Sequence, residues 1–216
     1  MTIATKICGI SDAAALDAAV AGGAHWVGLM FYPPSPRALD LQQAAALTAR
    51  MPDDGPERVG VFVDPDDALL VSTIAACEPH MLQLHGAESP ARVREIRARF
   101  GRPVMKACKI AEAPDVAAAR DYDGVADCLL FDARAPENAP DALPGGNGLS
   151  FDWRLLKDTI WQIPWMLSGG LEAGNVAAAV AATGARAVDV SSGVESAPGR
   201  KDPAAITAFL DAVRAL

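Results

Sequence analysis

The sequence predicts a single (β/α)8 barrel that spans residues 1–216, and three observations support this fold class. Short runs of apolar and β-branched residues alternate with Ala-rich segments of helical period, and eight such pairs follow one another along the chain. The length of 216 residues is enough for one well-buried domain and rather short for two. The alternative is an open doubly wound sheet, but no Gly-x-Gly-x-x-Gly motif follows the first predicted strand.

The predicted elements follow from this alternation in chain order. Each strand is a short apolar run, and the runs occupy residues 4–8, 26–31, 59–63, 80–85, 103–108, 127–132, 164–168 and 186–191. The helices that follow them are predicted at residues 12–22, 40–51, 66–77, 89–100, 112–121, 153–158, 173–183 and 203–215. One long loop, residues 133–152, is rich in Pro, Gly, Ala and Asn, and loops of this length are often functional.

Capping residues mark the boundaries of several predicted helices. Side chains that favour helix starts are found at Ser11 or Asp12, at Ser89 before Pro90, and at Asp202 before Pro203. Glycines stand where helices should end, at residues 22–23 and at residue 184. These signals fit the helical period and support the same boundaries.

The composition excludes several classes of partner. The chain carries 27 acidic and 19 basic residues, and a net charge of −8 argues against general binding to nucleic acid or to an anionic membrane. No stretch approaches the roughly 20 apolar residues of a membrane helix. The N-terminal residues lack the apolar core and cleavage site of a signal peptide. We therefore expect a cytoplasmic protein with no membrane or nucleic-acid partner.

The cysteines and histidines predict neither a disulfide framework nor a metal site. The cysteines are far apart, contain no Cys-x-x-Cys pair and are expected to be reduced: Cys8, Cys77, Cys108 and Cys128. His25 and His80 fall at strand starts, so only His85 lies at the opposite end of a strand. One histidine is too few for the usual ligand sets, and His85 is interpreted as a structural residue.

In a barrel of this class the site lies at the C-terminal ends of the strands, and the first strand ends in a thiol. Cys8 can act as a base if it ionises, and because a free thiol has a pKa of about 8.5, a nearby cation would help. Lys6 lies two residues earlier and should share its face of the strand. The alternative for Cys8 is a small core residue, as free cysteines usually are.

Two further charged residues stand at strand ends or in the loops beyond them. Asp132 ends an apolar run, where a carboxylate is costly unless it is paired or functional. It is interpreted as a general acid across the barrel mouth from Cys8, with a cap for the next loop as the alternative. Arg37 lies in a proline-stiffened loop and can grip a carboxylate with two hydrogen bonds, although a loop arginine is more often simply solvated.

Glycine clusters at residues 145–148, 169–170 and 193 accompany the last three strands. Such turns expose backbone N–H groups to an anion, and barrels of this class often bind phosphate in the loops after strands 7 and 8. Glycine also ends helices and makes turns, so a single cluster would say little. Clusters at consecutive strand ends favour a phosphate site.

A series of motifs runs in order through essentially the full chain. They are Lys6-Ile7-Cys8-Gly9, Phe31-Tyr32-Pro33-Pro34-Ser35-Pro36-Arg37, Val59-Gly60-Val61-Phe62-Val63, Gln83-Leu84-His85-Gly86, Leu130-Phe131-Asp132, Phe151-Asp152-Trp153, Leu167-Ser168-Gly169-Gly170-Leu171, Asn175-Val176, the stretch 189–195 and Pro198-Gly199-Arg200-Lys201-Asp202. Each motif is short, but together and in this order they resemble the phosphoribosylanthranilate isomerase family of tryptophan biosynthesis.

The resemblance implies a single-domain TIM barrel that converts N-(5-phosphoribosyl)anthranilate to 1-(2-carboxyphenylamino)-1-deoxyribulose 5-phosphate. This Amadori rearrangement needs no metal or organic cofactor. The matching positions imply Asp132 as the general acid, Cys8 as the general base and Arg37 as the group that holds the anthranilate carboxylate. Backbone amides would hold the phosphate, around Gly146, Gly148, Gly169, Gly170, Ser192 and Gly193. The expected partner is this phosphosugar-anthranilate substrate, and the expected oligomeric state is a monomer, with a homodimer as the alternative.

The chain departs from the family pattern at Leu149, where relatives often carry a lysine or a similar polar residue. No side-chain cation from this position can therefore assist phosphate binding. Other activities fit less well: a metal-dependent sugar-phosphate epimerase would need histidines and carboxylates at several strand ends, and a dual-substrate isomerase would use an aspartate pair. The pair of Cys8 and Asp132 also argues against a catalytically silent barrel.

Overall fold

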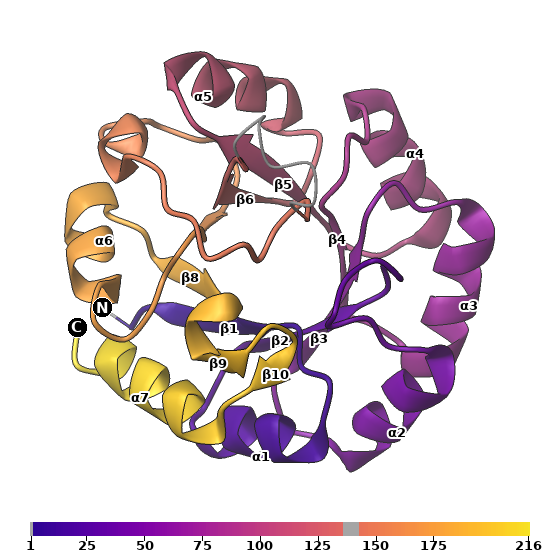
Figure 1. Ribbon diagram of the computed structural model, residues 1–216. Coiled ribbons are helices and arrows are strands. Elements are labelled where there is room, and N and C mark those ends of the chain that lie inside the picture. Colours follow the sequence, from indigo (N-terminus) through magenta and orange to yellow (C-terminus); the bar gives the residue numbers. More distant parts are fainter. Residues whose placement is uncertain (1, 136–142) are drawn as a thin grey trace.

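A computed structural model describes residues 2–135 and 143–216, and its centre is a closed parallel barrel (Figure 1). The strands are β1 (Ala4–Cys8), β2 (Trp26–Met30), β3 (Glu57–Phe62), β4 (Met81–Leu84), β5 (Val104–Ile110), β6 (Cys128–Ala133), β7 (Trp165–Leu167) and β8 (Ala187–Val190). They neighbour one another in chain order, and β1 closes the barrel against β8. This closure pairs Lys6 with Asp189. The predicted fold class is confirmed, although residues 136–142 of the predicted long loop lie outside the described residues.

Helices surround the barrel and run back along its outer face (Figure 1). They are α1 (Ala13–Ala21), α2 (Leu41–Arg50), α3 (Asp67–Cys77), α4 (Pro90–Phe100), α5 (Ala113–Ala119), α6 (Val176–Thr183) and α7 (Pro203–Arg214). The predicted caps are present: the side chains of Asp12, Ser89 and Asp202 accept hydrogen bonds from N–H groups of the first helical turn. Gly184 ends α6 in the left-handed conformation.

Five short elements differ from the prediction. The segment predicted as a helix at residues 153–158 is a single 3-10 turn, η2 (Trp153–Leu156), because the backbone becomes extended at Lys157, with a ψ of 136°, and left-handed at Asp158, with a φ of 59°. The fifth helix ends early and continues as a second 3-10 turn, η1 (Arg120–Tyr122). After β8 the chain forms a third, η3 (Ser192–Val194), and then the antiparallel hairpin β9 (Glu195–Ala197) and β10 (Arg200–Lys201), which the sequence analysis did not predict.

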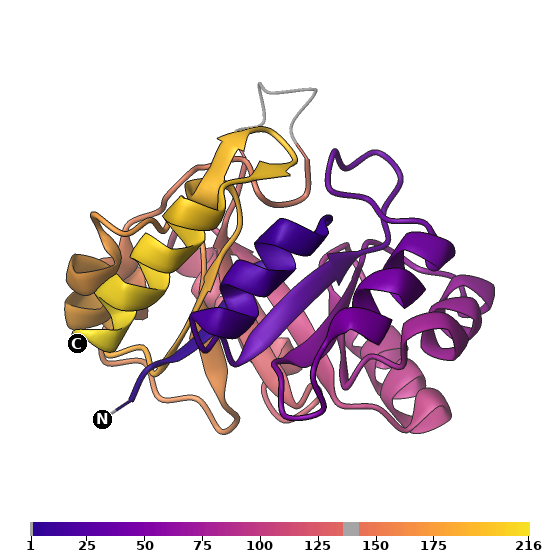
Figure 2. The ribbon, with the colours of Figure 1, turned by 90° about the horizontal axis from the view of Figure 1, so that it is seen from below.

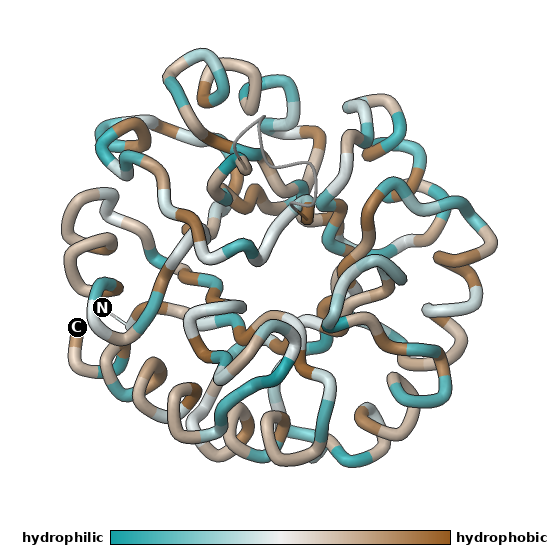
Figure 3. Tube along the Cα trace, viewed as in Figure 1, coloured by the Kyte–Doolittle hydropathy of each residue, from teal (hydrophilic) through white to brown (hydrophobic). Residues whose placement is uncertain are grey.

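Because side chains along each strand point alternately outward and inward, the buried residues form a layer between strands and helices and a second layer inside the barrel. Apolar side chains that point outward pack under the helices, whereas an inward layer of Met105, Ala107, Cys128, Leu130 and Met166 fills one part of the barrel. In Figure 3 hydrophobic residues follow the ring of strands, and hydrophilic residues are frequent on the outer turns of the helices. Among the described residues, no helix is long and apolar enough to cross a membrane.

The loops at the C-terminal ends of the strands gather at one edge of the molecule. Figure 2 shows this edge, where the hairpin β9–β10 rises (yellow). The opposite edge carries both chain termini. Because every strand of a parallel barrel delivers its last residue to the same edge, side chains from distant parts of the sequence meet there.

Candidate active site

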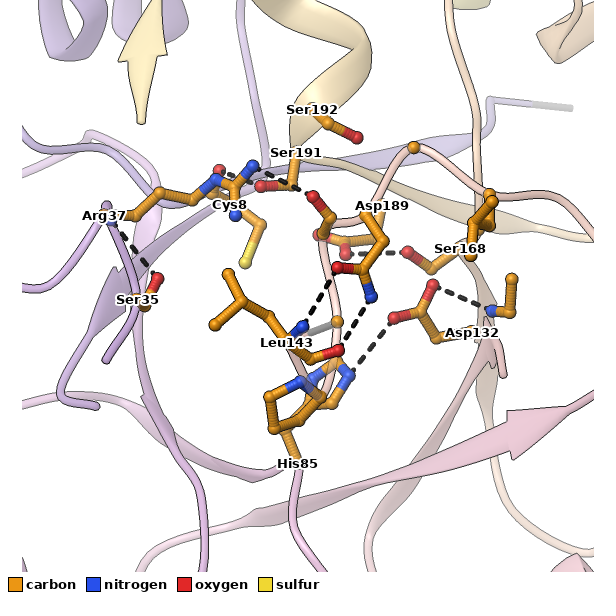
Figure 4. A pocket seen from close by; sticks show the side chains of 18 of the residues that line it. Cys8, Ser35, Arg37, His85, Asp132, Leu143, Ser168, Asp189, Ser191 and Ser192 are labelled. Atoms are coloured by element: carbon orange, nitrogen blue, oxygen red, sulfur yellow. Dashed lines mark hydrogen bonds and ion pairs between the residues drawn. The ribbon is translucent and has the colours of Figure 1, made fainter. Parts of the chain in front are cut away.

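A cavity opens at the C-terminal edge of the barrel, and it brings together most of the predicted site residues (Figure 4). The predicted residues that line it are Cys8, Arg37, Asp132, Gly146, Gly148, Gly169, Gly170 and Ser192. Gly193 is not among the described residues that line the cavity. A Cβ atom at that position would clash with the Leu171 carbonyl oxygen, so this glycine permits close backbone packing behind the cavity wall.

The thiol of Cys8 lies above a fully buried ion pair. Lys6 is 0% exposed and its Nζ donates to Asp189 Oδ1 at 2.8 Å, while Ser168 Oγ donates to Asp189 Oδ2 at 3.1 Å. Burial opposes the charged form of Lys6, but the negative charge of Asp189 and the hydrogen bond to it outweigh burial, so the pKa of Lys6 is raised. The barrel interior therefore holds a permanent cation below the thiol.

The pKa of Cys8 reflects two opposing effects. Burial raises it, because a thiolate in the apolar interior loses its hydration. The charges of Lys6 and Lys201 act in the opposite direction and lower it. The expected assistance from Lys6 is thus present, but without a ligand the pKa of the Cys8 thiol still lies above the ordinary value for cysteine.

Gly28 on β2 makes the approach of Cys8 to Lys6 feasible. A Cβ atom at this position would lie 2.9 Å from Cys8 Sγ and 3.3 Å from Lys6 Nζ. Any side chain larger than hydrogen would therefore push the thiol and the ammonium group out of place. Glycine at residue 28 therefore leaves room for the Cys8 thiol and the Lys6 ammonium group to lie side by side.

A Gly28→Ala variant is expected to lose at least about tenfold in kcat with a much smaller change in KM, because it displaces the thiol rather than a binding group. Overpacking of this kind should also lower the free energy of unfolding by roughly 1–3 kcal/mol. Steady-state kinetics and thermal unfolding measure both effects. Gly174→Ala is the matched control, since its added methyl group meets only Glu172 Oε1 at 3.6 Å. Equal kcat values for the two variants would contradict this role of Gly28.

Asp132 lies at the end of β6, with a partner for each carboxyl oxygen. Oδ1 accepts from the N–H of Ala133 at 2.9 Å, and Oδ2 lies 3.2 Å from His85 Nε2. His85 Nδ1 in turn lies 2.9 Å from Gln83 Nε2. These contacts fix the plane of the carboxyl group at the cavity wall, and Figure 4 shows His85 directed at Asp132.

The sequence did not predict the hydrogen bond between His85 and Asp132. The interpretation of His85 as a packed or hydrogen-bonded structural residue agrees with its hydrogen bonds, but it did not include a place in the cavity wall. The available signal was the alternation along β4, which points Gln83 and the residue two positions later to the same face. Gly145 packs tightly here as well, since a Cβ atom on it would lie 2.5 Å from His85 Nε2 and 2.8 Å from Asp132 Oδ2.

Arg37 reaches the cavity from the loop after β2, but two of its nitrogens are already engaged. Nε donates to Glu195 Oε1 at 2.6 Å and Nη2 donates to Glu195 Oε2 at 2.8 Å, and Nη2 also donates to the carbonyl oxygen of Gly146 at 3.0 Å. Burial would raise the pKa of Glu195, but Arg37 and Lys201 more than offset this effect, so the pKa is lowered. Nη1 donates no hydrogen bond within the part of the chain that the structure describes.

The glycine-rich turns bring backbone N–H groups to the wall of the cavity. Gly148, Gly169 and Gly170 have φ values of 70°, 89° and 65°, a backbone conformation that other residues rarely adopt. Their N–H groups donate no hydrogen bond to other described residues. Ser192 begins the 3-10 turn η3, whose first N–H groups have no partner within the turn. Unpaired N–H groups from three successive strand ends form a suitable cradle for an anion.

Metal ligation is not supported by the side chains in this region. Within residues 2–135 and 143–216, no three His, Cys, Asp or Glu side chains cluster as a metal site would require. The site therefore offers a thiol, a carboxyl group, a guanidinium edge and backbone amides. Such a set can move protons and bind anions.

Comparison with known proteins identifies the family. A family model described as N-(5'-phosphoribosyl)anthranilate (PRA) isomerase matches residues 5–212. The chain belongs to the PRA isomerase family. The resemblance of the ordered motifs is thereby confirmed, and with it the assignment to an isomerase family of tryptophan biosynthesis.

Individual relatives of the PRA isomerase family agree over their whole length. The N-(5'-phosphoribosyl)anthranilate isomerase of Rhodospirillum centenum is 55% identical over 216 residues, which is 100% of both chains. A crystal structure of phosphoribosyl anthranilate isomerase from Thermotoga maritima superimposes with a TM-score of 0.86 at 32% identity and covers 100% of both chains. Another PRA isomerase structure, in complex with reduced 1-(o-carboxyphenylamino)-1-deoxyribulose 5-phosphate, has a TM-score of 0.84 at 31% identity, again over 100% of both chains.

Proposed function

We propose that this chain isomerises N-(5-phosphoribosyl)anthranilate to 1-(2-carboxyphenylamino)-1-deoxyribulose 5-phosphate by general acid and base catalysis. The observation that carries the proposal is the shared cavity of Cys8 and Asp132, walled by glycine-rich strand ends. Membership of the PRA isomerase family supports it, as does the relative that binds the reduced product. A reaction that only relocates protons and a double bond requires the kinds of groups that line this cavity.

In the proposed mechanism, Asp132 gives its proton to the furanose ring oxygen, and the C1′–O bond breaks to leave a Schiff base. The thiolate of Cys8 then takes the proton from C2′, and the electron pair of that C–H bond forms the enolamine. Tautomerisation of the enolamine yields the ketone. One proton leaves the acid and one reaches the base, so the net charge of the protein does not change. The two roles require opposite protonation states, which distinct environments for the two groups can maintain.

Two anionic groups of the substrate fit the remaining parts of the site. The phosphate is assigned to the backbone cradle around Gly148, Gly169, Gly170 and Ser192, with Gly146 beside it, whereas Gly193 packs behind the cavity wall. The anthranilate carboxylate is assigned to Arg37, through Nη1. Leu149 adds no charge, so phosphate binding depends on backbone amides and the local positive potential.

An Arg37→Ala variant is expected to raise KM by roughly 10- to 100-fold, the range expected for a lost charge-assisted hydrogen bond, with a smaller effect on kcat. The guanidinium group lies at the cavity wall but outside the acid–base pair, so it contributes mainly to binding. Initial rates over a range of substrate concentrations separate the two constants. A fall in kcat at unchanged KM would contradict the assignment of the carboxylate to Arg37.

The reaction itself is tested by the loss of anthranilate-type fluorescence when purified protein meets freshly generated substrate. Rapid, protein-dependent loss supports the proposed isomerisation, and heat-inactivated protein serves as the blank. No loss with a substrate batch that another PRA isomerase consumes would overturn the proposal. Sedimentation of the same sample tests the further expectation of a monomer against the alternative of a homodimer.

A further inference from the structure

The hairpin β9–β10 carries a buried cluster of charges that the proposed chemical steps do not use. Glu195 lies between Arg37 and Lys201, and the three side chains are only 3%, 4% and 0% exposed, respectively. Buried charges of this kind are costly unless each is paired, and an unpaired member destabilises the fold. The cluster adjoins the cavity through Arg37 and therefore concerns the site directly.

The carboxylate of Glu195 is saturated with donors. Oε1 accepts from Arg37 Nε at 2.6 Å and from Lys201 Nζ at 2.7 Å. Oε2 accepts from Arg37 Nη2 at 2.8 Å and from the N–H of Gly199 at 3.2 Å. Two donors on each oxygen leave the carboxylate no freedom to rotate, and the bidentate contact fixes the plane of the guanidinium group.

The hairpin is itself anchored to three strand ends. At its turn, Gly199 has a φ of 78°, and a Cβ atom there would lie 2.5 Å from the carbonyl oxygen of Pro36, so the turn packs directly on the loop that carries Arg37. Lys201 Nζ donates to the carbonyl oxygen of Ser191 at 2.8 Å, and Ser191 Oγ donates to the carbonyl oxygen of Cys8 at 3.2 Å. The hairpin thus holds the ends of β1, β2 and β8 together.

The charges of the cluster do not cancel. Two cations share one carboxylate, so Arg37 and Lys201 together keep one positive charge beside the cavity. If Glu195 were paired with Arg37 alone, it would neutralise the guanidinium charge and weaken the attraction of Arg37 for a second carboxylate. Lys201 donates to the same Oε1 atom of Glu195, and its positive charge offsets this neutralisation. A net positive cluster with one guanidinium edge open is suited to an anionic ligand.

Among the described residues, Nη1 is the part of the guanidinium group that donates no hydrogen bond, and Gly146 leaves room beside it. A Cβ atom at residue 146 would lie 2.6 Å from Arg37 Nη1, whereas the glycine leaves that space empty. On the other flank, a Cβ atom at Gly9 would lie 2.6 Å from Arg37 Cδ. The side chain therefore runs in a channel between two glycines, and Figure 4 shows it on the same side of the cavity as Cys8 and away from Asp132.

We propose that Glu195 is a positioning residue for substrate specificity, which holds Arg37 so that Nη1 faces the aryl carboxylate of the substrate. Lys201 assists by keeping the cluster positive. The inference rests on the proposed role of Arg37 and deepens it, because it explains how one loop arginine is fixed in a single orientation without a ligand. An arginine that is already ordered loses less conformational entropy when the carboxylate binds.

The experiment compares two ligands that differ in one group. The first is the reduced product analogue, reduced 1-(o-carboxyphenylamino)-1-deoxyribulose 5-phosphate, and the second is its counterpart with hydrogen in place of the carboxylate. For a Glu195→Gln variant we expect the dissociation constant of the first ligand to rise by about tenfold or more and that of the second to change by less than about twofold. If the role of Glu195 were purely structural, the variant would bind both ligands more weakly and to the same extent.

Control variants separate positioning from folding and from charge. Glu95→Gln makes the same chemical change on α4, where the side chain is 55% exposed, and it should affect neither ligand. Gly199→Ala keeps all three charges but moves the hairpin against Pro36, and it should reproduce the selective loss even if Glu195→Gln fails to fold. Thermal unfolding establishes that each variant is native.

The outcomes distinguish this inference from the proposed function. If the wild-type protein binds the two ligands equally well, the carboxylate role of Arg37 is wrong and the role of Glu195 falls with it. If the wild-type protein prefers the carboxylate and both variants keep that preference in full, only the role of Glu195 is overturned. Tighter binding of the carboxylate ligand by Glu195→Gln would also overturn it, since Glu195 would then be a competitor and not a positioning group.

Discussion

A Cys8→Ser variant is expected to fold normally and to lose about 10²- to 10⁴-fold in kcat, the typical contribution of a positioned acid or base. A serine hydroxyl occupies nearly the same space as the thiol, but it does not ionise near neutral pH. The side chain lies at the cavity wall over the Lys6–Asp189 ion pair, so substrate binding should be little affected. Fluorescence-based initial rates measure the change, with KM expected to stay within a few-fold.

Cys108→Ser is the matched control for this variant. Cys108 is another buried thiol, whose pKa burial raises to about 12, but it packs in the outer apolar core and does not line the cavity. Its replacement should leave kcat unchanged. Near-normal turnover by Cys8→Ser, or an equal loss in both variants, would remove Cys8 from the mechanism.

The pH profile gives a second check on the same residue. Because burial raises the pKa of Cys8, with Lys6 only partly opposing it, the thiolate fraction of the free protein increases as the pH rises above neutral. The ultraviolet absorbance of the thiolate, taken as the difference between the wild-type protein and Cys8→Ser, should therefore climb with pH over this range. A difference that stays flat across the same range would contradict an ionising thiol as the base.

Local sequence patterns were sufficient to predict the strands and most helices of the barrel, but not its short turns and its hairpin. Apolar runs and helix caps place the regular elements because burial and capping act within a few residues. The turn at residues 153–156 was predicted as a helix because nothing in its composition signals the left-handed conformation of Asp158. The hairpin at residues 195–201 escaped prediction, since strands of three and two residues are too short to show a period.

In the site, too, the positions of residues at strand ends could be predicted from the sequence, whereas contacts between residues far apart in the chain could not. The rule that functional groups lie at strand ends gave candidates at every strand, Cys8 and Asp132 among them, and the family resemblance singled out these two as the predicted base and acid. It could not reveal that Arg37 is held by Glu195, because these residues lie 158 positions apart and meet only after the barrel closes. The contact between His85 and Asp132 was missed for a similar reason, since the two residues lie 47 positions apart and meet only in the folded barrel.

The second large effect is expected for Asp132→Asn, which should lower kcat by about 10²- to 10⁴-fold while the fold and KM change little. The amide oxygen can still accept from the N–H of Ala133. The amide nitrogen can donate to His85 Nε2 once the ring proton moves to Nδ1 and Gln83 turns its amide oxygen toward it, so the cavity wall keeps its shape. An amide has no acidic proton to give to the ring oxygen. Asp152→Asn is the control, because this 45% exposed carboxylate caps η2 outside the cavity and asparagine caps equally well.

An isotope effect distinguishes the two catalytic variants, because the acid and the base act in different steps. With substrate deuterated at C2′, Cys8→Ser should show a large primary isotope effect on kcat, since proton removal becomes rate-limiting. Asp132→Asn should show an effect close to one, because ring opening breaks no bond to that hydrogen. A large isotope effect in Asp132→Asn would mean that Asp132 serves proton removal as well, and the acid that opens the ring would then have to be sought in His85, its hydrogen-bond partner at 3.2 Å.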